Sequence, residues 1–127
     1  MHRNTFLKSP GKLTFEYELI GHPGVFFAGQ ITGVEGYVES AASGLLAAIG
    51  IERRLKGLCP IDFSRETALG ALGHYVSEYN GSDFQPMNIN FSIMAPPVRR
   101  LKNKQERNLA LSERSLKIID NLKAKIL

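Results

Sequence analysis

The hydrophobic and polar positions near the start of the chain predict two short strands. Residues 13–20 alternate in part, with apolar side chains on one face and Thr14, Glu16 and Glu18 on the other, which is typical of a half-buried strand. Gly21-His22-Pro23-Gly24 then indicates a turn. Residues 25–28 (VFFA) form an uninterrupted apolar run, which predicts a strand buried on both faces.

Three helices are predicted after these strands. Apolar residues at helical spacing predict a first helix that begins near Gly36 and ends before Gly57 and Pro60. A second helix is expected from about Glu66 to Tyr79, with N-cap residues within 62–64. A third is expected from about residue 101 onwards. Its predicted buried stripe is Leu109, Ser112, Leu116, Ile119, Leu122 and Ile126.

These elements together predict a mixed α/β fold, with a few strands covered by three helices. The length of 127 residues is that of one ordinary domain, and no apolar stretch approaches a membrane span. The start lacks the apolar region of a secretory signal. The single cysteine, Cys59, excludes an internal disulfide and is interpreted as a small packing residue. We therefore expect a cytoplasmic protein, although one cysteine is compatible with any compartment.

The positive charge is concentrated at the end of the chain. Residues 99–127 contain nine Lys/Arg and three Asp/Glu, whereas residues 1–98 contain seven and nine. This asymmetry points to an anionic partner, usually nucleic acid, or to a solvated helix face. Arg100, Lys104 and Arg107 would share one face if all three lay within a helix.

Residues 29–36 (GQITGVEG) carry the strongest candidate chemistry. Three glycines follow an apolar run and precede the first helix, so backbone N–H groups could approach a phosphate or an anionic ring at a helix N-terminus. The spacing G-x-x-x-G-x-x-G differs from the dinucleotide fingerprint G-x-G-x-x-G. The pattern alone is equally compatible with a tight βα turn. Glu35 and Glu39 could bind a ligand, but helix capping by Glu35 is the simpler interpretation.

The histidines give no indication of a metal site. His2, His22 and His74 are scattered along the chain, and Cys59 does not cluster with them. His74, within the second predicted helix, is interpreted as a partner for a neighbouring polar group. We assign no catalytic residue and no metal ligand.

Several long segments, in order, resemble the folate- and FAD-dependent tRNA (uracil-5-)-methyltransferases, the TrmFO or Gid family. The most specific is FFAGQITGVEGYVESAASGLLA at residues 26–47. MHRNTF at the start, RETALGALGHYV at 65–76, FQPMNINF at 84–91 and KNKQERN at 102–108 also look like that family. The resemblance spans essentially the whole chain.

The resemblance implies a partial FAD-binding, Rossmann-like fold, with residues 1–98 as the C-terminal part of the FAD-binding domain and 99–127 as a basic helix. Family members are several times longer, so the chain looks like a C-terminal portion that lacks the nucleotide fingerprint and the catalytic cysteine. The expected partner is then the missing N-terminal portion of the same enzyme, and the isolated chain is expected to be inactive.

The implied reaction is methylation of C5 of a T-loop uridine in tRNA. Methylenetetrahydrofolate would supply the carbon, FAD the reducing equivalents, and NAD(P)H would re-reduce the flavin. The resemblance places the flavin at Gly29, Gln30, Ile31, Thr32, Gly33, Gly36 and Tyr37. It places Arg3 and Asn4 at the edge of this flavin pocket, and the folate at Glu35 and Tyr37. The tRNA contacts expected from the basic segment are Arg99, Arg100, Lys102, Lys104 and Arg107.

Two other functions remain open from the sequence. One is an RNA-binding module whose basic tail works by itself. The other is a portion of a different FAD-dependent tRNA-modifying oxidoreductase, because related glycine loops occur in such proteins.

Overall fold

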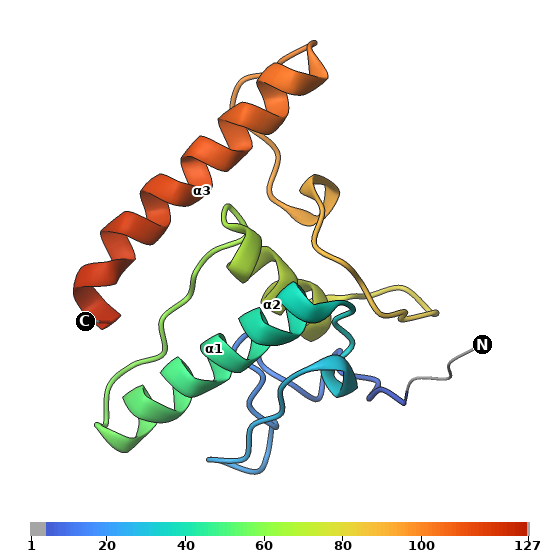
Figure 1. Cartoon of the computed structure of the whole chain (residues 1–127). Coiled ribbons are helices and arrows are strands. Elements are labelled where there is room, and N and C mark those ends of the chain that lie inside the picture. The colour runs from blue at the N-terminus through green and yellow to red at the C-terminus, as the bar shows by residue number, and fades with distance from the viewer. Residues whose placement is uncertain (1–4, 127) are drawn as a thin grey trace.

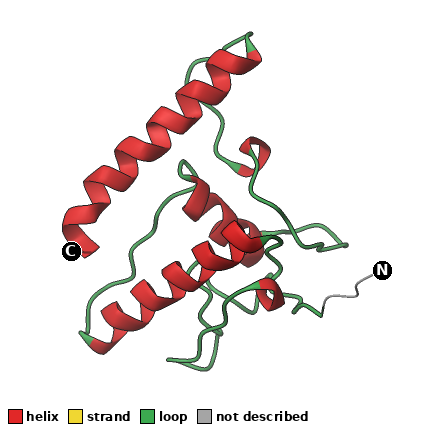
Figure 2. Cartoon of the chain, in the orientation of Figure 1, coloured by secondary structure: helices red, strands yellow, loops and turns green. Residues whose placement is uncertain are grey.

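The computed structural model describes residues 5–126, and its regular structure is helical (Figures 1 and 2). The long helices are α1 (Tyr37–Leu55), α2 (Ala68–Glu78) and α3 (Lys104–Ile126). Two short 3₁₀ helices, η1 (Gln30–Thr32) and η2 (Phe91–Ile93), precede α1 and α3 respectively. The prediction of three helices is therefore confirmed, with boundaries shifted by a few residues.

The predicted α/β fold class is wrong, because residues 5–126 contain isolated β-bridges but no strand. Leu13 pairs with Leu19 and Glu18 with Phe26, each as a single antiparallel bridge. Tyr17 takes a left-handed φ of 67°, which interrupts the alternation on which the first strand was predicted. The segment folds into successive turns instead of extending.

The apolar run at residues 25–28 fails as a strand for a different reason. A strand buried on both faces needs a layer on each side. In the described residues Val25 is 44% exposed, Phe26 and Phe27 are half-buried, and Ala28 is exposed. The run is therefore only partly covered.

Helices α1 and α2 begin differently. Gly36 precedes α1 with a φ of 110°, and no side chain caps that end. Thr67 caps α2: its Oγ1 accepts a hydrogen bond from the Gly70 amide at 2.9 Å and donates to the Phe63 carbonyl at 2.8 Å. The predicted cap within residues 62–64 was thus a few residues too early. A Cβ at Gly70 would lie 2.0 Å from the Ser64 carbonyl oxygen, so only glycine allows α2 to lie this close to the preceding loop.

The core lies between α1, α2 and the turns before α1. Its fully enclosed centre includes Tyr17, Val34 and Val76. Burial raises the pKa of Tyr17 above its ordinary value, so the phenol stays protonated. Its hydroxyl has no hydrogen-bond partner among the described residues. Tyr17 therefore acts as a packing residue, held by its ring rather than by a polar contact.

Helix α3 lies along one side of this body, as the upper left of Figure 1 shows. The Asn103 Oδ1 atom accepts a hydrogen bond from the Gln105 amide at 2.8 Å and so caps the helix. The predicted buried stripe is partly wrong, because Leu109 and Leu116 are 59% and 64% exposed. Leu111, which the stripe omitted, is the residue of α3 that is buried. Ile119, Leu122 and Ile126 pack against the edge of the core.

The described residues contain neither a membrane-spanning helix nor a cluster of metal ligands. No helix within residues 5–126 combines the length and the apolar character needed to cross a bilayer. Over the same residues, no three His, Cys, Asp or Glu side chains come together as metal ligands would.

Candidate functional site

The glycine loop, residues 29–36, connects the turns of the N-terminal segment to α1. Gly29, Gly33 and Gly36 have φ values of 85°, 97° and 110°, in the left-handed region that disfavours other residues. Between the first two lies η1, which turns the chain sharply before α1. The sequence pattern found this loop correctly, although the preceding strand is absent from the described residues.

The three glycines have different surroundings. A Cβ at Gly29 would meet nothing within 4 Å. A Cβ at Gly33 would lie 2.4 Å from Cζ of Phe84, and one at Gly36 would lie 2.2 Å from Oε2 of Glu39. Gly33 and Gly36 therefore serve close packing inside the protein. Gly29 is the position where the backbone faces open space.

The inner side of the loop is fastened by hydroxyl groups. Ser9 Oγ donates to the Thr32 carbonyl at 2.6 Å, and Thr32 Oγ1 donates to the Gly29 carbonyl at 2.7 Å. Ser43 Oγ, from α1, accepts a hydrogen bond from the Gly29 amide at 2.7 Å. Ser9, Thr32 and Ser43 are all fully buried. The side chain of Thr32 is thus buried and hydrogen-bonded inside the protein, where it supports the loop.

The FQPMNINF segment at residues 84–91 supports the loop from a second side. Val34 and Met87 form a parallel bridge, with the Glu35 amide donating to the Met87 carbonyl at 3.0 Å. Asn88 Nδ2 donates to the Glu35 carbonyl at 2.6 Å. Sequence reasoning did not foresee these contacts, which join positions more than fifty residues apart. The available signal was that both segments carry the family resemblance.

An aromatic cluster lies beneath Gly33. The ring of Phe84 lies between 5.6 and 6.1 Å, centroid to centroid, from those of Phe6, Tyr75 and Tyr79. Burial, with a smaller effect of Tyr79, raises the pKa of Tyr75 above its ordinary value of 10.0. Its protonated hydroxyl donates to the Gln85 carbonyl at 2.7 Å. These rings form a rigid support that fixes the position of Gly33.

The outer side of the loop is open to solvent. Gln30, Ile31 and Glu35 are exposed, and Tyr37 is 97% exposed. The backbone amides of Gln30 and Ile31 make no hydrogen bond within the described residues. Two N–H donors next to Gly29 therefore have no hydrogen-bond partner among the described residues, as the donors of an anion-binding loop would.

The N-terminus of α1 already has a carboxylate beside it. Glu39 is only 8% exposed, lies next to Gly36 and accepts a hydrogen bond from the Ile89 amide at 3.0 Å. The expected capping by Glu35 is not seen, since no side chain caps this helix and Glu35 is exposed. Because Glu39 lies at the positive end of α1, the unpaired amides of Gln30 and Ile31 are the better donors for an anionic group.

His74 on α2 lies between two carboxylates, as expected for a residue that partners polar groups. Its Nε2 lies 2.8 Å from Asp62 Oδ1 and its Nδ1 lies 3.1 Å from Glu78 Oε1. A hydrogen bond from Arg65 is the largest influence on Glu78 and holds the pKa of that carboxyl below its ordinary value of 4.5. The ring of His74 stacks on that of Phe15 at 5.2 Å. This cluster ties α2 to the N-terminal turns.

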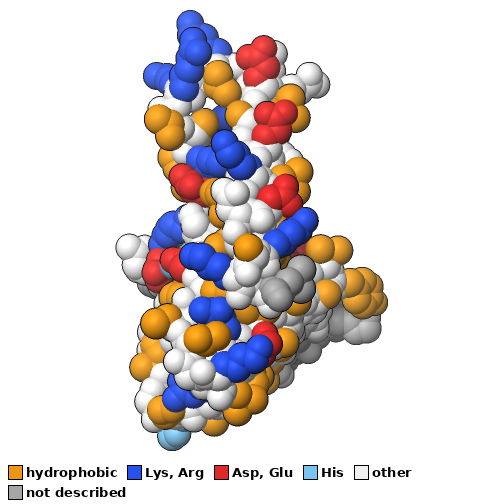
Figure 3. Space-filling model, turned by 90° about the vertical axis from the view of Figure 1, so that its left-hand side faces the viewer, with side chains coloured by type: hydrophobic (Ala, Val, Ile, Leu, Met, Phe, Trp, Pro, Cys, Tyr) orange, Lys and Arg blue, Asp and Glu red, His pale blue; other side chains and the backbone are white. Residues whose placement is uncertain are grey.

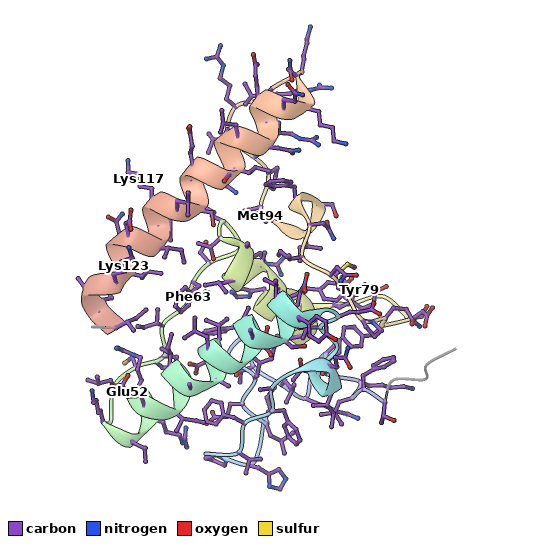
Figure 4. The ribbon with its side chains drawn as sticks, viewed as in Figure 1. Glu52, Phe63, Tyr79, Met94, Lys117 and Lys123 are labelled. Atoms are coloured by element: carbon purple, nitrogen blue, oxygen red, sulfur yellow. The ribbon has the colours of Figure 1, made fainter. Side chains whose placement is uncertain are left out.

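The basic residues expected to contact tRNA are all exposed, but they do not share one helix face. Arg99, Arg100 and Lys102 precede α3, which begins at Lys104. The expected helical register of Arg100 with Lys104 and Arg107 is therefore wrong, because Arg100 is not helical. Figure 3 shows Lys and Arg at the upper end and along the length of the visible face, with Asp and Glu interspersed among them. In Figure 4, Lys117 lies on the side of α3 that faces away from α1 and α2.

Two expected site residues, Arg3 and Asn4, lie outside the described residues. The other candidates for the flavin and folate form one continuous segment, residues 29–37. Within it, the structure separates an outward group (Gly29, Gln30, Ile31, Glu35 and Tyr37) from an inward group (Thr32, Gly33 and Gly36).

Comparison with known proteins identifies the family to which this loop belongs. The sequence model of the family described as "Glucose inhibited division protein A" matches residues 1–59, which include the glycine loop and α1. The chain is 53% identical over 116 residues to the methylenetetrahydrofolate--tRNA-(uracil-5-)-methyltransferase TrmFO of Lactiplantibacillus plantarum, covering 91% of this chain and 26% of that protein.

Proteins of the same name give similar matches in two other bacteria. The Bacillus licheniformis protein is 51% identical over 122 residues, which is 96% of this chain and 28% of that protein. The Pelotomaculum thermopropionicum protein is 49% identical over 127 residues, which is 100% of this chain and 29% of that protein. The chain belongs to the TrmFO/GidA family, and it spans between a quarter and a third of the length of these curated relatives.

Proposed function

We propose that this chain is the flavin-side portion of a folate- and FAD-dependent tRNA (uracil-5-)-methyltransferase. The observation that carries the proposal is identity of about one residue in two with enzymes of that name over almost the whole chain. The complete enzyme would methylate C5 of the T-loop uridine of tRNA in the cytoplasm. Residues 1–98 would belong to its FAD-binding domain, and residues 99–127 would form a basic helix.

The outer side of the glycine loop fits a flavin. A flat ring with an electron-rich edge could approach Gly29, where a Cβ would meet nothing, and accept hydrogen bonds from the Gln30 and Ile31 amides. Ile31 and Tyr37 would provide apolar cover around it. Thr32, Gly33 and Gly36 belong to the proposed site by shaping the loop. When bound, FAD supplies reducing equivalents to the carbon from methylenetetrahydrofolate, and NAD(P)H restores the reduced flavin.

The folate would lie on the same outward side. Tyr37 is almost completely exposed, so its ring is free to stack on an aromatic ligand. Glu35 is exposed next to it and offers a carboxylate to N–H groups of a pterin. We propose these two residues as folate contacts.

The tRNA would contact the basic segment. Arg99, Arg100, Lys102, Lys104 and Arg107 are exposed around the start of α3. Cations on a solvent-facing segment contact phosphates and position the nucleic acid, without reading its bases. The fold of the T-loop would then supply the specificity.

The proposed flavin contact can be tested at a single N–H group. The test uses a hybrid protein, in which this chain replaces the matching segment of the Bacillus licheniformis relative. Gln30→Pro removes the Gln30 amide hydrogen at the first position of η1, where proline fits the backbone. Gln30→Ala is the matched control, because it removes the same side chain and keeps the amide.

We expect Gln30→Pro to weaken FAD binding by about tenfold, as befits the loss of one hydrogen bond to a charged group. Gln30→Ala should bind FAD like the parent. The measurement is the FAD content after gel filtration, together with a titration of the apoprotein. Equal affinity for the proline and alanine variants would remove the amide from the flavin site. Gly33→Val is a poorer test, because its side chain would collide with Phe84.

The enzymatic proposal has its own test. Unmodified tRNA is incubated with methylenetetrahydrofolate and NADPH, and 5-methyluridine is measured. We expect product with the hybrid and none with the isolated chain, because the chain contains no residue to which we assign catalysis. Methylation by the isolated chain would contradict the proposal that it is only a portion of the enzyme.

A further inference from the structure

Helix α1 is apolar on both of its sides. Its inner side contains the buried residues Leu46, Ala47 and Ile49, which belong to the core or border it. Its outer side exposes Val38, Leu45 and Leu55 by 73%, 53% and 84%. We call this outer side the outer α1 face; it consists of Tyr37, Val38, Ala41, Leu45, Ala48 and Leu55.

The spacing of these residues makes the face continuous. From Val38, steps of three and four residues reach Ala41, Leu45, Ala48 and Leu55, with Glu52 at the remaining position. Such steps follow one side of a helix. Glu52 is the charged residue on this line, and Lys56 pairs with it at 2.6 Å near the end of the helix. The face therefore presents almost no polar group along nineteen residues of helix.

A surface helix of a water-soluble body carries polar residues opposite its buried side. A helix that is apolar all round is normally covered on all sides, and a large exposed apolar patch marks an interaction surface. Helix α3 also exposes two leucines, Leu109 and Leu116, but it carries a cation, Lys117, on the side that faces away from the body (Figure 4). The outer α1 face thus requires a cover that the described residues do not provide.

We propose that the outer α1 face is the docking surface for the part of the TrmFO polypeptide that lies outside the segment matched by this chain. The family relatives are long enough to supply it, since the chain covers only 26–29% of their length. The partner surface would be apolar, in keeping with the face it covers. The inference rests on the proposed function only in taking its partner from the same enzyme family.

The position of the face gives the docking a consequence for the site. Tyr37, the first residue of α1, belongs to the outer α1 face and directly follows the glycine loop, in which Ile31 is exposed. A polypeptide that covers the outer α1 face would therefore also lie next to the unpaired amides of Gln30 and Ile31. It would form one wall of the proposed flavin site and exclude water from it.

Cysteine labelling tests the cover directly. Cys59 is exposed, so it is first replaced by serine. Leu45→Cys then places a thiol on the outer α1 face, and Lys117→Cys places the control thiol on the outer side of α3. Each variant is made in the isolated chain and in the hybrid, and the rate of reaction with a maleimide is measured. The same cysteine at the aligned position of the unaltered Bacillus licheniformis relative gives the result in a natural full-length protein.

We expect labelling of the Leu45→Cys thiol to be slower by about tenfold or more in the hybrid and in the relative, because a covered position reacts only during local opening. The control thiol should react equally in all contexts. Equal rates at position 45 would overturn the proposal. A second copy of the chain is the competing occupant: concentration-dependent protection in the isolated chain, with the mass of a dimer, would overturn it as well.

A second variant separates docking from folding. Leu45→Glu should leave the thermal unfolding of the isolated chain unchanged, because Leu45 is half exposed there. The same change should lower the melting temperature of the hybrid. Unchanged melting of the hybrid would count against the docking surface. A hybrid that protects position 45 but binds no FAD and methylates no tRNA would refute the proposed function and leave the docking surface standing.

Discussion

Helices α1 and α3 are the two longest elements of this chain, and they take part in the fold in opposite ways. Six residues of α1 are buried, against one residue, Leu111, among those of α3. The outer side of α1 is apolar, whereas the exposed surface of α3 carries Lys and Arg interspersed with Asp and Glu. The length of a helix therefore says little about its share of the core. The polarity of the side facing away from the core says more about what else the helix must contact.

The attachments of the two helices differ accordingly. Helix α1 holds the glycine loop through Ser43 and packs directly on α2. Helix α3 is fastened by a few contacts, among them a hydrogen bond from Arg114 to the Pro96 carbonyl at 3.0 Å and one from Arg53 to the Lys125 carbonyl at 3.3 Å. We infer that α1 is the scaffold of the site and that α3 is an arm attached to it.

The largest expected effect compares a buried leucine from each helix. Leu46→Ala in α1 should lower the free energy of unfolding by about 3 kcal/mol, because a cavity forms in the main core. Leu111→Ala in α3 should cost about 2 kcal/mol and act mainly on α3, since Leu111 packs in a separate small cluster with Ala71 and Met94. Urea denaturation and amide exchange measure both. An equal loss of protection throughout the chain for the two variants would show that α3 is as integral as α1.

The second prediction concerns the charges at the start of α3. Replacing Arg100, Lys104 and Arg107 by Gln in the hybrid should reduce the slope of log K against log salt for tRNA by roughly 3, and weaken binding with it. Stability should change little, because all three side chains are exposed. Titration of tRNA at several salt concentrations is the measurement.

The control for that experiment removes the same number of charges elsewhere, by replacing exposed lysines with Gln. The control positions are Lys8, Lys12 and Lys56. An equal change of slope in this control would mean that net charge, and not the arm, governs the binding.

A smaller effect is expected at the attachment of α3. Arg114 donates to the carbonyls of Ala95 and Pro96, so Arg114→Ala should weaken the docking of α3 by about 1 kcal/mol. Faster amide exchange confined to α3 would show this. Lys117→Ala, a neighbouring cation that faces away from the body, is the control and should have no effect. Faster exchange in α1 as well would contradict the separation of scaffold and arm.

The smallest effect concerns α2, which supports both helices. The pKa of Glu78 is held below its ordinary value of 4.5, chiefly by Arg65, so its carboxylate stabilises the folded state at pH values above 4.5. This contribution is lost as the pH falls below 4.5 and through the folded-state pKa. Because the Arg65–Glu78 ion pair is partly exposed, Glu78→Gln should lower the free energy of unfolding by only a few tenths of a kcal/mol at neutral pH. The variant should also lose less stability than the parent as the pH falls.

Denaturation at pH 7 and pH 4 measures this difference. Since α2 contacts α1 and also α3, through the Ala68 amide and Ser115 Oγ at 3.3 Å, both helices should weaken together. A loss confined to one of them would contradict the role of α2 as a common support.

The sequence predicted the backbone of the candidate site but not the side chains that pack against it. The glycines at positions 29, 33 and 36 predicted a tight loop, and all three have a positive φ. Their separate surroundings could not be predicted, because Phe84 and Glu39 reach Gly33 and Gly36 through tertiary packing. The hydroxyl of Ser9 and the amide of Asn88 were missed for the same reason, since each contacts the loop from a distant part of the chain.

The sequence by itself determined the three helices, the turn-forming loop before α1 and the family, because helical spacing, glycine conformation and long ordered motifs are local properties of the chain. It also indicated strands, because apolar runs at residues 13–20 and 25–28 suit burial in a sheet. Only the tertiary structure decided that these runs fold as turns: a strand needs neighbouring strands to receive its backbone hydrogen bonds, and residues 5–126 supply single bridges. It likewise decided which side of each helix is covered, because burial depends on what the rest of the fold places against that side.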